Sequence, residues 1–302
     1  MQIGISSYGS ATIPDLLEEV ERAAAQGFHR FWLGEHGGWD PLTVFAALGG
    51  RAPGIELATS VVGTYPRHPL ALAAQALTTH AATGERLTLG VGPSHAPVVQ
   101  GRYGIEWQSP VRHARQVLDI LAPVLHGDEV NIHTGQIKAA GGVTAPGTTA
   151  PSLLLGANGP RMLALAGELA DGALTMWTTP EFVGEVVVPT VTRAAAGRAE
   201  PRIAVGLLAS VTADLDSARA FVRENFQQAS TLPTFRALLE RQGSAGPEDT
   251  LLGGDEDTVI KTVSRFAEAG ATELAIFPVG PPADQARTVE LFAQLARRQI
   301  TS

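Results

Sequence analysis

The stretch ELATSVVGTYPRHPLALAAQALTTHAATGERLTLGVG, residues 56–92, contains a complete strand–helix–strand unit. Apolar and β-branched residues over 55–62 and 86–92 predict two short buried strands. The segment 69–84 between them is rich in Ala and Leu, and it begins with Pro69, which is typical of a helix start. A helix of this length between two buried strands indicates that the strands run parallel. The unit therefore predicts an α/β fold.

The same alternation runs through the whole chain and gives eight strand–helix units. The expected strands are residues 2–6, 28–36, 55–62, 86–92, 151–157, 172–177, 202–211 and 273–279. Eight units favour a closed (β/α)₈ TIM barrel over an open doubly wound sheet. An open sheet predicts a glycine-rich dinucleotide turn after its first strand, and GISSYGSATIP does not supply one. We expect residues 1–302 to form a single barrel domain.

Two segments exceed what a minimal barrel needs. Residues 128–150 include the loop-like run AAGGVTAPGTTAP, and residues 229–256 read as short helices between flexible ends. Long insertions at strand ends commonly serve as lids or binding loops. We expect both insertion segments at the carboxyl-terminal ends of the strands.

The composition narrows the possible partners. The 302 residues include 22 Lys and Arg against 30 Asp and Glu, and the net charge of -8 argues against a nucleic-acid or anionic-membrane partner. The absence of cysteine excludes disulfides, thiolate metal sites and Cys nucleophiles. No apolar run approaches the roughly 20 residues of a membrane span, and MQIGISSYGS does not resemble a signal peptide. We expect a cytoplasmic protein that acts on a small molecule.

In a parallel barrel, functional residues gather where the strands end. The expected ends are Ser6–Ser7, Glu35–His36, Ser60–Gly63, Gly92–His95, Gly156–Asn158, Trp177, Ala209–Ser210 and Pro278–Gly280. The histidines show no metal-ligand spacing, so we expect no metal. His36 and His95 differ from the other histidines because each follows a strand. Trp39 and Trp177 are candidates to wall a flat ring system at the barrel mouth.

The run GANGPRM, residues 156–162, predicts an anion-binding helix start. Pro160 suits the first helical position, and Asn158 or Gly159 suits the cap. A helix start presents free N–H groups to an anion, and Arg161 lies close to it in sequence. Taken alone, this motif is a simple helix cap. Together with the glycine turn GVGPSHAP, residues 90–97, it favours a phosphate on a bound cofactor.

Three stretches together resemble the luciferase-like monooxygenase superfamily, and within it the branch that uses the deazaflavin coenzyme F420. They are FWLGEHGGWDPL (31–42), ATSVVGTYPRHPLALAAQALTTHAATGERLTLGVGPSH (58–95) and LLLGANGPRMLALAGELADGALTMW (153–177). The resemblance implies hydride transfer between the deazaflavin and a small organic substrate, and a homodimer. Two alternatives remain: an FMN-dependent monooxygenase on the same barrel, and a barrel that binds a flavin without catalysis.

The resemblance also implies roles for individual residues. It places a non-prolyl cis peptide at Ser60–Val61 behind the middle ring of the cofactor, and it makes His36 a donor or relay of a proton. Some relatives carry a Glu where this chain has His95, which puts a carboxylate acid in doubt. His36 and His95 are the expected catalytic residues. The expected cofactor contacts are Ser6, Glu35, His36, Ser60, Val61, Gly63, Gly92, Pro93, Ser94, His95, Gly156, Ala157, Asn158, Gly159 and Trp177.

Overall fold

Eight parallel strands close into a barrel, as predicted. The computed structural model describes residues 1–9, 12–36, 38–133 and 135–298. The barrel closes because β1 pairs with both β2 and β12, while β10 pairs with both β9 and β12. The strands are β1 (Gln2–Ser7), β2 (Arg30–Leu33), β3 (Glu56–Thr59) with its continuation β4 (Val62–Gly63), β5 (Leu87–Gly92), β8 (Ser152–Gly156), β9 (Gly172–Met176), β10 (Arg202–Val211) and β12 (Glu273–Pro278).

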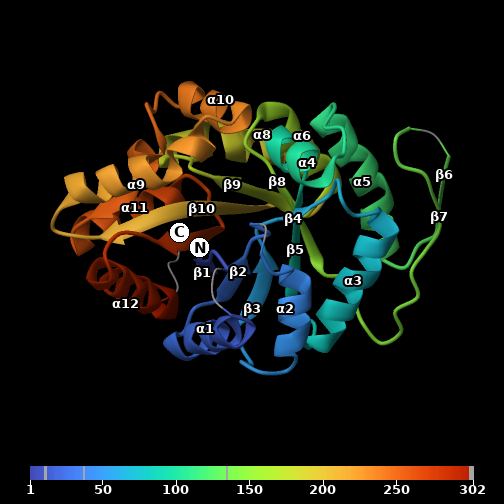
Figure 1. Ribbon diagram of the computed structural model, residues 1–302, viewed down its shortest axis with the longest axis horizontal. Coiled ribbons are helices and arrows are strands. Elements are labelled where there is room, and N and C mark those ends of the chain that lie inside the picture. Colours follow the sequence, from blue (N-terminus) through green and yellow to red (C-terminus); the bar gives the residue numbers. More distant parts are fainter. Residues whose placement is uncertain (10–11, 37, 134, 299–302) are drawn as a thin grey trace.

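Helices surround the barrel and connect its strands (Figure 1). Most begin at a proline in the first turn, and Thr12, Asp40, Asp214 and Asp255 cap helix starts with their side chains. The helices are α1 (Ile13–Gln26), α2 (Pro41–Leu48), α3 (Pro69–Ala82), α4 (Ala96–Tyr103), α5 (Pro110–Leu125), α6 (Pro160–Leu169), α7 (Pro180–Phe182), the π-helix η1 (Val183–Val187), α8 (Val188–Ala194), α9 (Leu215–Ser230), α10 (Pro233–Arg241), the 3₁₀ helix η2 (Pro247–Thr250), α11 (Glu256–Glu268) and α12 (Pro282–Arg298). Within the described ranges, no helix has both the length and the apolar character needed to cross a membrane.

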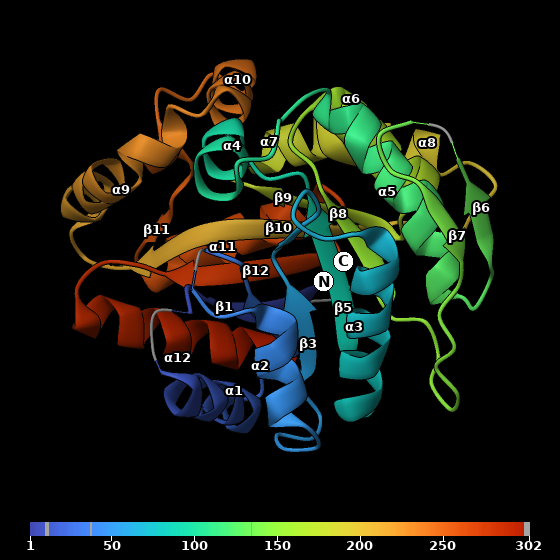
Figure 2. The ribbon, with the colours of Figure 1, turned by 45° about the vertical axis from the view of Figure 1, so that its right-hand side comes forward.

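The two insertion segments lie in different places. Residues 128–150 form the antiparallel hairpin of β6 (Val130–Ile132) and β7 (Ala139–Gly141), which stands outside α5 at the edge of the molecule (Figures 1 and 2). This segment leads from a helix into β8, so our expectation that it lies at the carboxyl-terminal ends of the strands is wrong. The segment 229–256 contains α10 and the short strand β11 (Leu252–Gly254), which pairs with the end of β10. β11 was not predicted, since LGG carries no strand pattern.

The interior of the barrel is filled in layers. Small side chains leave room for the Trp32 ring, and a Cβ atom at Gly4 would lie 2.7 Å from Trp32 Nε1. Nearer the amino ends of the strands, Arg30 and Arg202 both bind the buried carboxylate of Glu273. The apolar layer consists of Trp32, Ala58, Leu154, Leu174, Ala204 and Ala275, with Val61 packed on it. The space above Val61 is the cavity described next.

Candidate active site

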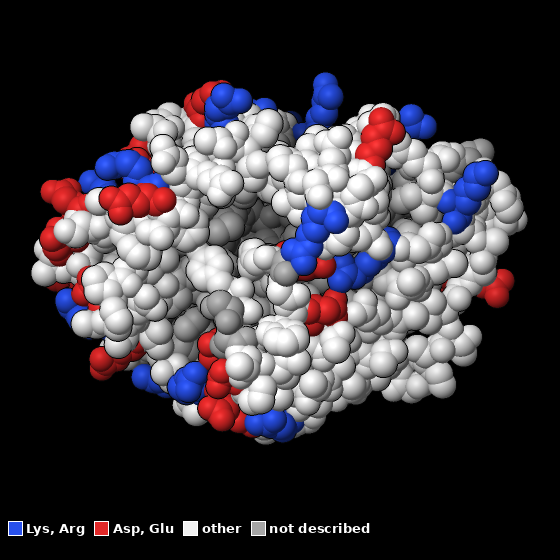
Figure 3. Space-filling model, viewed as in Figure 1, with Lys and Arg blue, Asp and Glu red and all other residues white. Residues whose placement is uncertain are grey.

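A cavity of about 850 Å³ opens at the carboxyl ends of the strands. Figure 3 shows a hollow near the centre of this face, with most of its rim formed by uncharged side chains. The volume lies in the upper part of the range typical of small-molecule sites. Its position agrees with the prediction that functional residues gather at the strand ends.

Nearly all of the predicted site residues line this cavity. They are Glu35, His36, Ser60, Val61, Gly63, Gly92, Pro93, Ser94, His95, Gly156, Ala157, Asn158, Gly159 and Trp177. Ser6 does not line it, although its buried hydroxyl has no hydrogen-bond partner in the described part of the chain. Tyr8, two residues further along, reaches the cavity instead. Trp39 is 46% exposed and also lies outside the lining.

Val61 forms the floor of the cavity, and the Ser60–Val61 peptide bond is cis, as the resemblance implies. A Cβ atom at Gly92 would lie 2.9 Å from Val61 Cγ2, and one at Gly156 would lie 3.3 Å from Val61 Cγ1. The two glycines therefore bring β5 and β8 close to both sides of the Val61 side chain. The result is a narrow apolar floor flanked by backbone.

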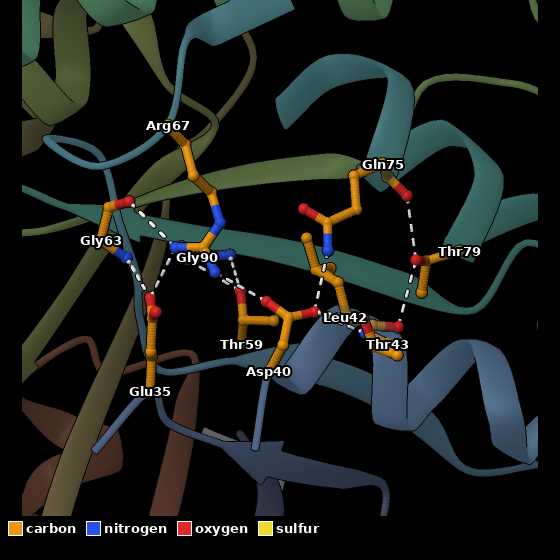
Figure 4. Close-up of polar contacts among 10 residues, drawn as sticks. All are labelled: Glu35, Asp40, Leu42, Thr43, Thr59, Gly63, Arg67, Gln75, Thr79 and Gly90. Carbon is orange, nitrogen blue, oxygen red and sulfur yellow. Dashed lines mark hydrogen bonds and ion pairs between the residues drawn. The ribbon is translucent and has the colours of Figure 1, made fainter. Parts of the chain in front are cut away.

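Glu35 holds the loop after β3 in place. Its Oε2 atom accepts hydrogen bonds from the Gly63 N–H at 2.8 Å and from Arg67 Nη1 at 2.8 Å (Figure 4). Arg67 Nη2 binds Asp40 Oδ2 at 2.7 Å, so one guanidinium joins two carboxylates from the segment after β2. The Glu35 carboxylate is thus committed to protein partners. Glu35 lines the cavity and its Oε2 atom fixes the loop, while its contact with a cofactor stays a prediction.

His36 lies at the edge of the cavity. Its ring folds back over the end of β2, where a Cβ atom at Gly34 would overlap Nε2. The ring centroid is 5.7 Å from that of Tyr8. Loss of water around the ring lowers the pKa of His36 below its ordinary value of 6.5, and the nearby Glu35 charge opposes this shift. A neutral imidazole therefore faces the cavity at neutral pH.

His95 lies after the end of β5, directly before α4. Its ring centroid is 5.2 Å from that of Phe235, and removal of water lowers its pKa. His95 is the N-cap residue of α4, but its imidazole makes no hydrogen bond to the first turn of that helix. The preceding turn is tied down because Trp107 Nε1 donates to the Pro93 carbonyl at 3.2 Å. The structure does not bring His36 and His95 into a direct ring pair.

The GANGPR turn starts α6 in the predicted way, and the structure decides between the two predicted cap residues. Gly159 is the cap residue and Pro160 is the first helical residue. Asn158 does not cap the helix, because its Oδ1 atom accepts hydrogen bonds from Thr175 Oγ1 at 3.0 Å and from the Met176 N–H at 3.1 Å. Asn158 therefore ties the ends of β8 and β9 together.

Two arginines stand at this helix start. Arg161 belongs to the first turn of α6, and Arg241 is the last residue of α10. A Cβ atom at Gly159 would lie 3.8 Å from Arg241 Nη1, so the insertion reaches across to the turn. Both arginines line the cavity, and neither forms an ion pair within the described residues. The combination of helix N–H groups and two cationic side chains suits an anion.

Trp177 is held in an unusual backbone conformation at the end of β9. It is 1% exposed, and its φ angle of 59° is in the left-handed region, which is rare for a bulky residue. Gln242 Nε2 donates to the Trp177 carbonyl at 2.7 Å, and Gln242 Oε1 accepts from the Thr179 N–H at 3.1 Å. One side chain of the insertion therefore fixes this corner of the cavity. Such backbone strain is concentrated at functional sites.

Aromatic residues that the sequence did not single out close the remaining side. Phe226 lies 6.2 Å from Tyr8 and 6.1 Å from Trp177, measured between ring centroids. Phe235 lies 4.4 Å from Trp177, and Phe277 lies 4.9 Å from Tyr8. Phe226 and Phe235 come from the long connection between β10 and β11, where no strand-end pattern marks them. Only the unusual length of that connection indicated a role.

The site fits a flat ring that carries an anionic arm. The Val61 floor provides an apolar seat, and the α6 start provides an anion seat beside it. Trp177 and Ser60 line the cavity, and their Nε1 and Oγ atoms are buried without a hydrogen-bond partner in the described chain. The described residues contain no group of three or more His, Asp or Glu side chains placed to hold a metal ion.

Comparisons with known proteins agree with this geometry. The chain is 30% identical over 277 residues to a protein of Mycobacterium tuberculosis that is predicted to be a coenzyme F420-dependent oxidoreductase, covering 84% of this chain and 76% of that one. The coenzyme F420-dependent tetrahydromethanopterin reductase from Methanopyrus kandleri shares the fold with a TM-score of 0.79 at 21% identity, covering 99% of each chain.

An FMN complex has the same fold. The oxygenating constituent of 3,6-diketocamphane monooxygenase from Pseudomonas putida superposes with a TM-score of 0.75 at 19% identity, covering 100% of this chain and 99% of that one. The model of the family described as luciferase-like monooxygenase matches residues 2–298, from the first barrel strand to the last helix. A match of that extent shows that this chain belongs to the luciferase-like monooxygenase family.

Proposed function

We propose that the protein is an oxidoreductase that uses coenzyme F420 and transfers a hydride between the deazaflavin and a small organic substrate. The observation that carries this proposal is the narrow Val61 floor between Gly92 and Gly156, beside an anion seat at the start of α6. Such a pair of seats suits a flat tricyclic ring with a phosphate-bearing side chain. The similarity to the mycobacterial relative favours F420 over FMN.

The residues around the floor would hold the cofactor. Val61 supports the ring, while the turn Gly92–His95 and the turn Gly156–Gly159 follow its side chain. Arg161 and Arg241 pair with its phosphate. Trp177 and Ser60, which also line the cavity, would border the ring. The ion pairs of Arg67 keep the loop below the ring in position.

The bound 5-deazaflavin supplies or accepts two electrons as a hydride at its C5 carbon. His36 accepts and donates the accompanying proton. Its neutral imidazole accepts the proton that leaves the substrate when the substrate is oxidised, and the imidazolium returns that proton in the reverse direction. His95, after the end of β5, would contact the cofactor side chain, at the position where the resemblance implies a carboxylate acid in some relatives.

Titration of the purified protein with F420 and with FMN tests the proposal. We expect saturable binding of F420, which is monitored by the change in deazaflavin fluorescence. Binding of FMN should be much weaker. Tight FMN binding without F420 binding would reverse the assignment and make the protein an FMN-dependent monooxygenase. Binding of neither cofactor would contradict the enzymatic proposal altogether.

The resemblance also carries a proposal about assembly. A homodimer is expected, and a mass measured by light scattering that corresponds to one chain of 31.5 kDa would refute it.

A further inference from the structure

Charged side chains line only one part of the cavity. Its only charged lining side chains among the described residues, apart from the histidines, are Glu35, Arg161 and Arg241. Glu35 is engaged by Arg67, and the two arginines lie together at the start of α6. The lining from the segment after β1 and from β9, β10, β12 and α9 contains no Asp, Glu, Lys or Arg. The half of the cavity that these elements line is therefore electrically neutral.

Aromatic rings enclose this neutral half. The ring centroid of Tyr8 is 4.9 Å from that of Phe277 and 6.2 Å from that of Phe226. The centroid of Phe226 is in turn 6.1 Å from that of Trp177. Leu174, Gly206 and Ala275 line the cavity on the side of the barrel strands. We call this space the aromatic compartment. A charged ligand placed there would lose its water without gaining an opposite charge, which is strongly unfavourable.

Two polar groups stand at the border of the aromatic compartment. The Tyr8 hydroxyl has no hydrogen-bond partner in the described chain, and the His36 ring is 5.7 Å from the Tyr8 ring. Burial raises the pKa of the Tyr8 phenol, so the hydroxyl keeps its proton and acts as a donor. One donor and one imidazole can hold a single oxygen atom and leave the rest of the ligand in apolar surroundings.

We infer that the aromatic compartment is the substrate site, and that it selects an uncharged, largely apolar molecule with one carbonyl or hydroxyl oxygen. Tyr8 donates a hydrogen bond to that oxygen, and Phe226 of α9 forms one wall. This inference rests on the proposed function. The transferred hydride joins or leaves the carbon bonded to that oxygen, and the proton moves between that oxygen and His36, so that a ketone and an alcohol interconvert while the deazaflavin is oxidised or reduced.

Three probes of matched shape test the inference: cyclohexanone, cyclohexanecarboxylate and cyclohexylamine. Their binding to the F420-loaded protein and to the cofactor-free protein is measured by ligand-observed NMR. We expect cyclohexanone to bind at least tenfold more tightly than either charged probe. Equal or tighter binding of a charged probe to the F420-loaded protein, in which the anion site at the start of α6 is filled, would overturn the inference. F420 titration is recorded separately, so a failure of the cofactor assignment is distinguishable from a failure of the charge selection.

Variants locate the binding in the aromatic compartment. Phe226→Ala should weaken cyclohexanone binding roughly tenfold and leave F420 affinity unchanged, because it removes a wall from the substrate side only. Phe221→Ala is the matched control, since Phe221 belongs to the same helix but does not line this cavity. Tyr8→Phe keeps the ring and removes the hydroxyl, and should lower kcat/KM with cyclohexanone roughly tenfold. Unchanged cyclohexanone binding in Phe226→Ala would show that the substrate lies elsewhere.

Discussion

At the scale of single residues, His36 is set apart from the other histidines by its surroundings. The ring is packed over Gly34 and faces Tyr8, and the loss of water lowers its pKa below 6.5. A lowered pKa means that the neutral form persists to more acidic pH. The rate of substrate oxidation should therefore be independent of pH above about 6.5 and fall as the pH drops through the His36 pKa.

His36→Gln tests this role. We expect kcat to fall by roughly 10²-fold or more and the acidic limb of the pH profile to disappear, since general-base catalysis contributes on this order. The measurement is turnover against pH with F420 at saturation. His126→Gln is the control, because His126 is an exposed residue at the end of α5. Persistence of the same acidic limb in His36→Gln would assign the titration to another group.

At the scale of elements, the loop from β4 to α3 is rigid because Arg67 connects it to the segment after β2. The guanidinium is 19% exposed and binds Glu35 and Asp40, while Asp40 Oδ1 also caps α2 and accepts from Gln75 Nε2 at 2.8 Å. Removing one partner leaves two half-buried carboxylates without their counter-charge. This network therefore couples the cavity floor to the packing of α2 and α3.

Arg67→Ala should lower the free energy of unfolding by about 1–3 kcal/mol and weaken cofactor binding. Arg67→Lys should lie between the wild type and Ala, because a single ammonium cannot reproduce the forked contact to two carboxylates. Urea unfolding and F420 titration measure the two effects. Arg115→Ala, which breaks the exposed pair with Glu168, should cost less than about 1 kcal/mol. Equal losses in Arg67→Ala and Arg115→Ala would contradict the structural role of the network.

At the scale of the whole molecule, the closed barrel depends on a charge cluster inside it. Glu273 at the start of β12 is 1% exposed and binds Arg30 from β2 and Arg202 from β10. Trp32 Nε1 also donates to Glu273 Oε1 at 3.1 Å. The carboxylate thus connects strands from the beginning and the end of the chain. Without its charge, two arginines inside the barrel would face each other uncompensated.

Glu273→Gln keeps the size of the side chain and removes the charge. We expect a loss of about 3–5 kcal/mol in the free energy of unfolding, as is typical when one partner of a buried pair is removed. Glu256→Gln breaks the exposed pair with Arg287, which solvent screens, and should have far less effect. Equilibrium urea unfolding compares the variants. A Glu273→Gln protein as stable as wild type would show that the cluster does not hold the barrel closed.

The sequence by itself determined the barrel and the position of its mouth. Alternating apolar strands and helical segments are local patterns, and so are the caps, such as Pro160 at the start of α6. The strand ends follow directly from them, which is why Val61, Gly92, Gly156 and Trp177 were predicted and line the cavity. Each of these positions depends on the residue itself and its near neighbours in the chain.

Only the tertiary structure decided what completes the site. Phe226, Phe235 and Arg241 reach the mouth from a connection more than sixty residues beyond the α6 start, and nothing in their local sequence indicates that approach. Asn158 and Gly159 were both candidates for the cap of α6; Gly159 takes that position, and Asn158 bonds to β9. Glu35 lines the cavity, and its carboxylate also binds Arg67. These partners are chosen by distances that exist only after the barrel has closed. The chain's periodicity specifies the strands, whereas closure specifies which side chains meet across them.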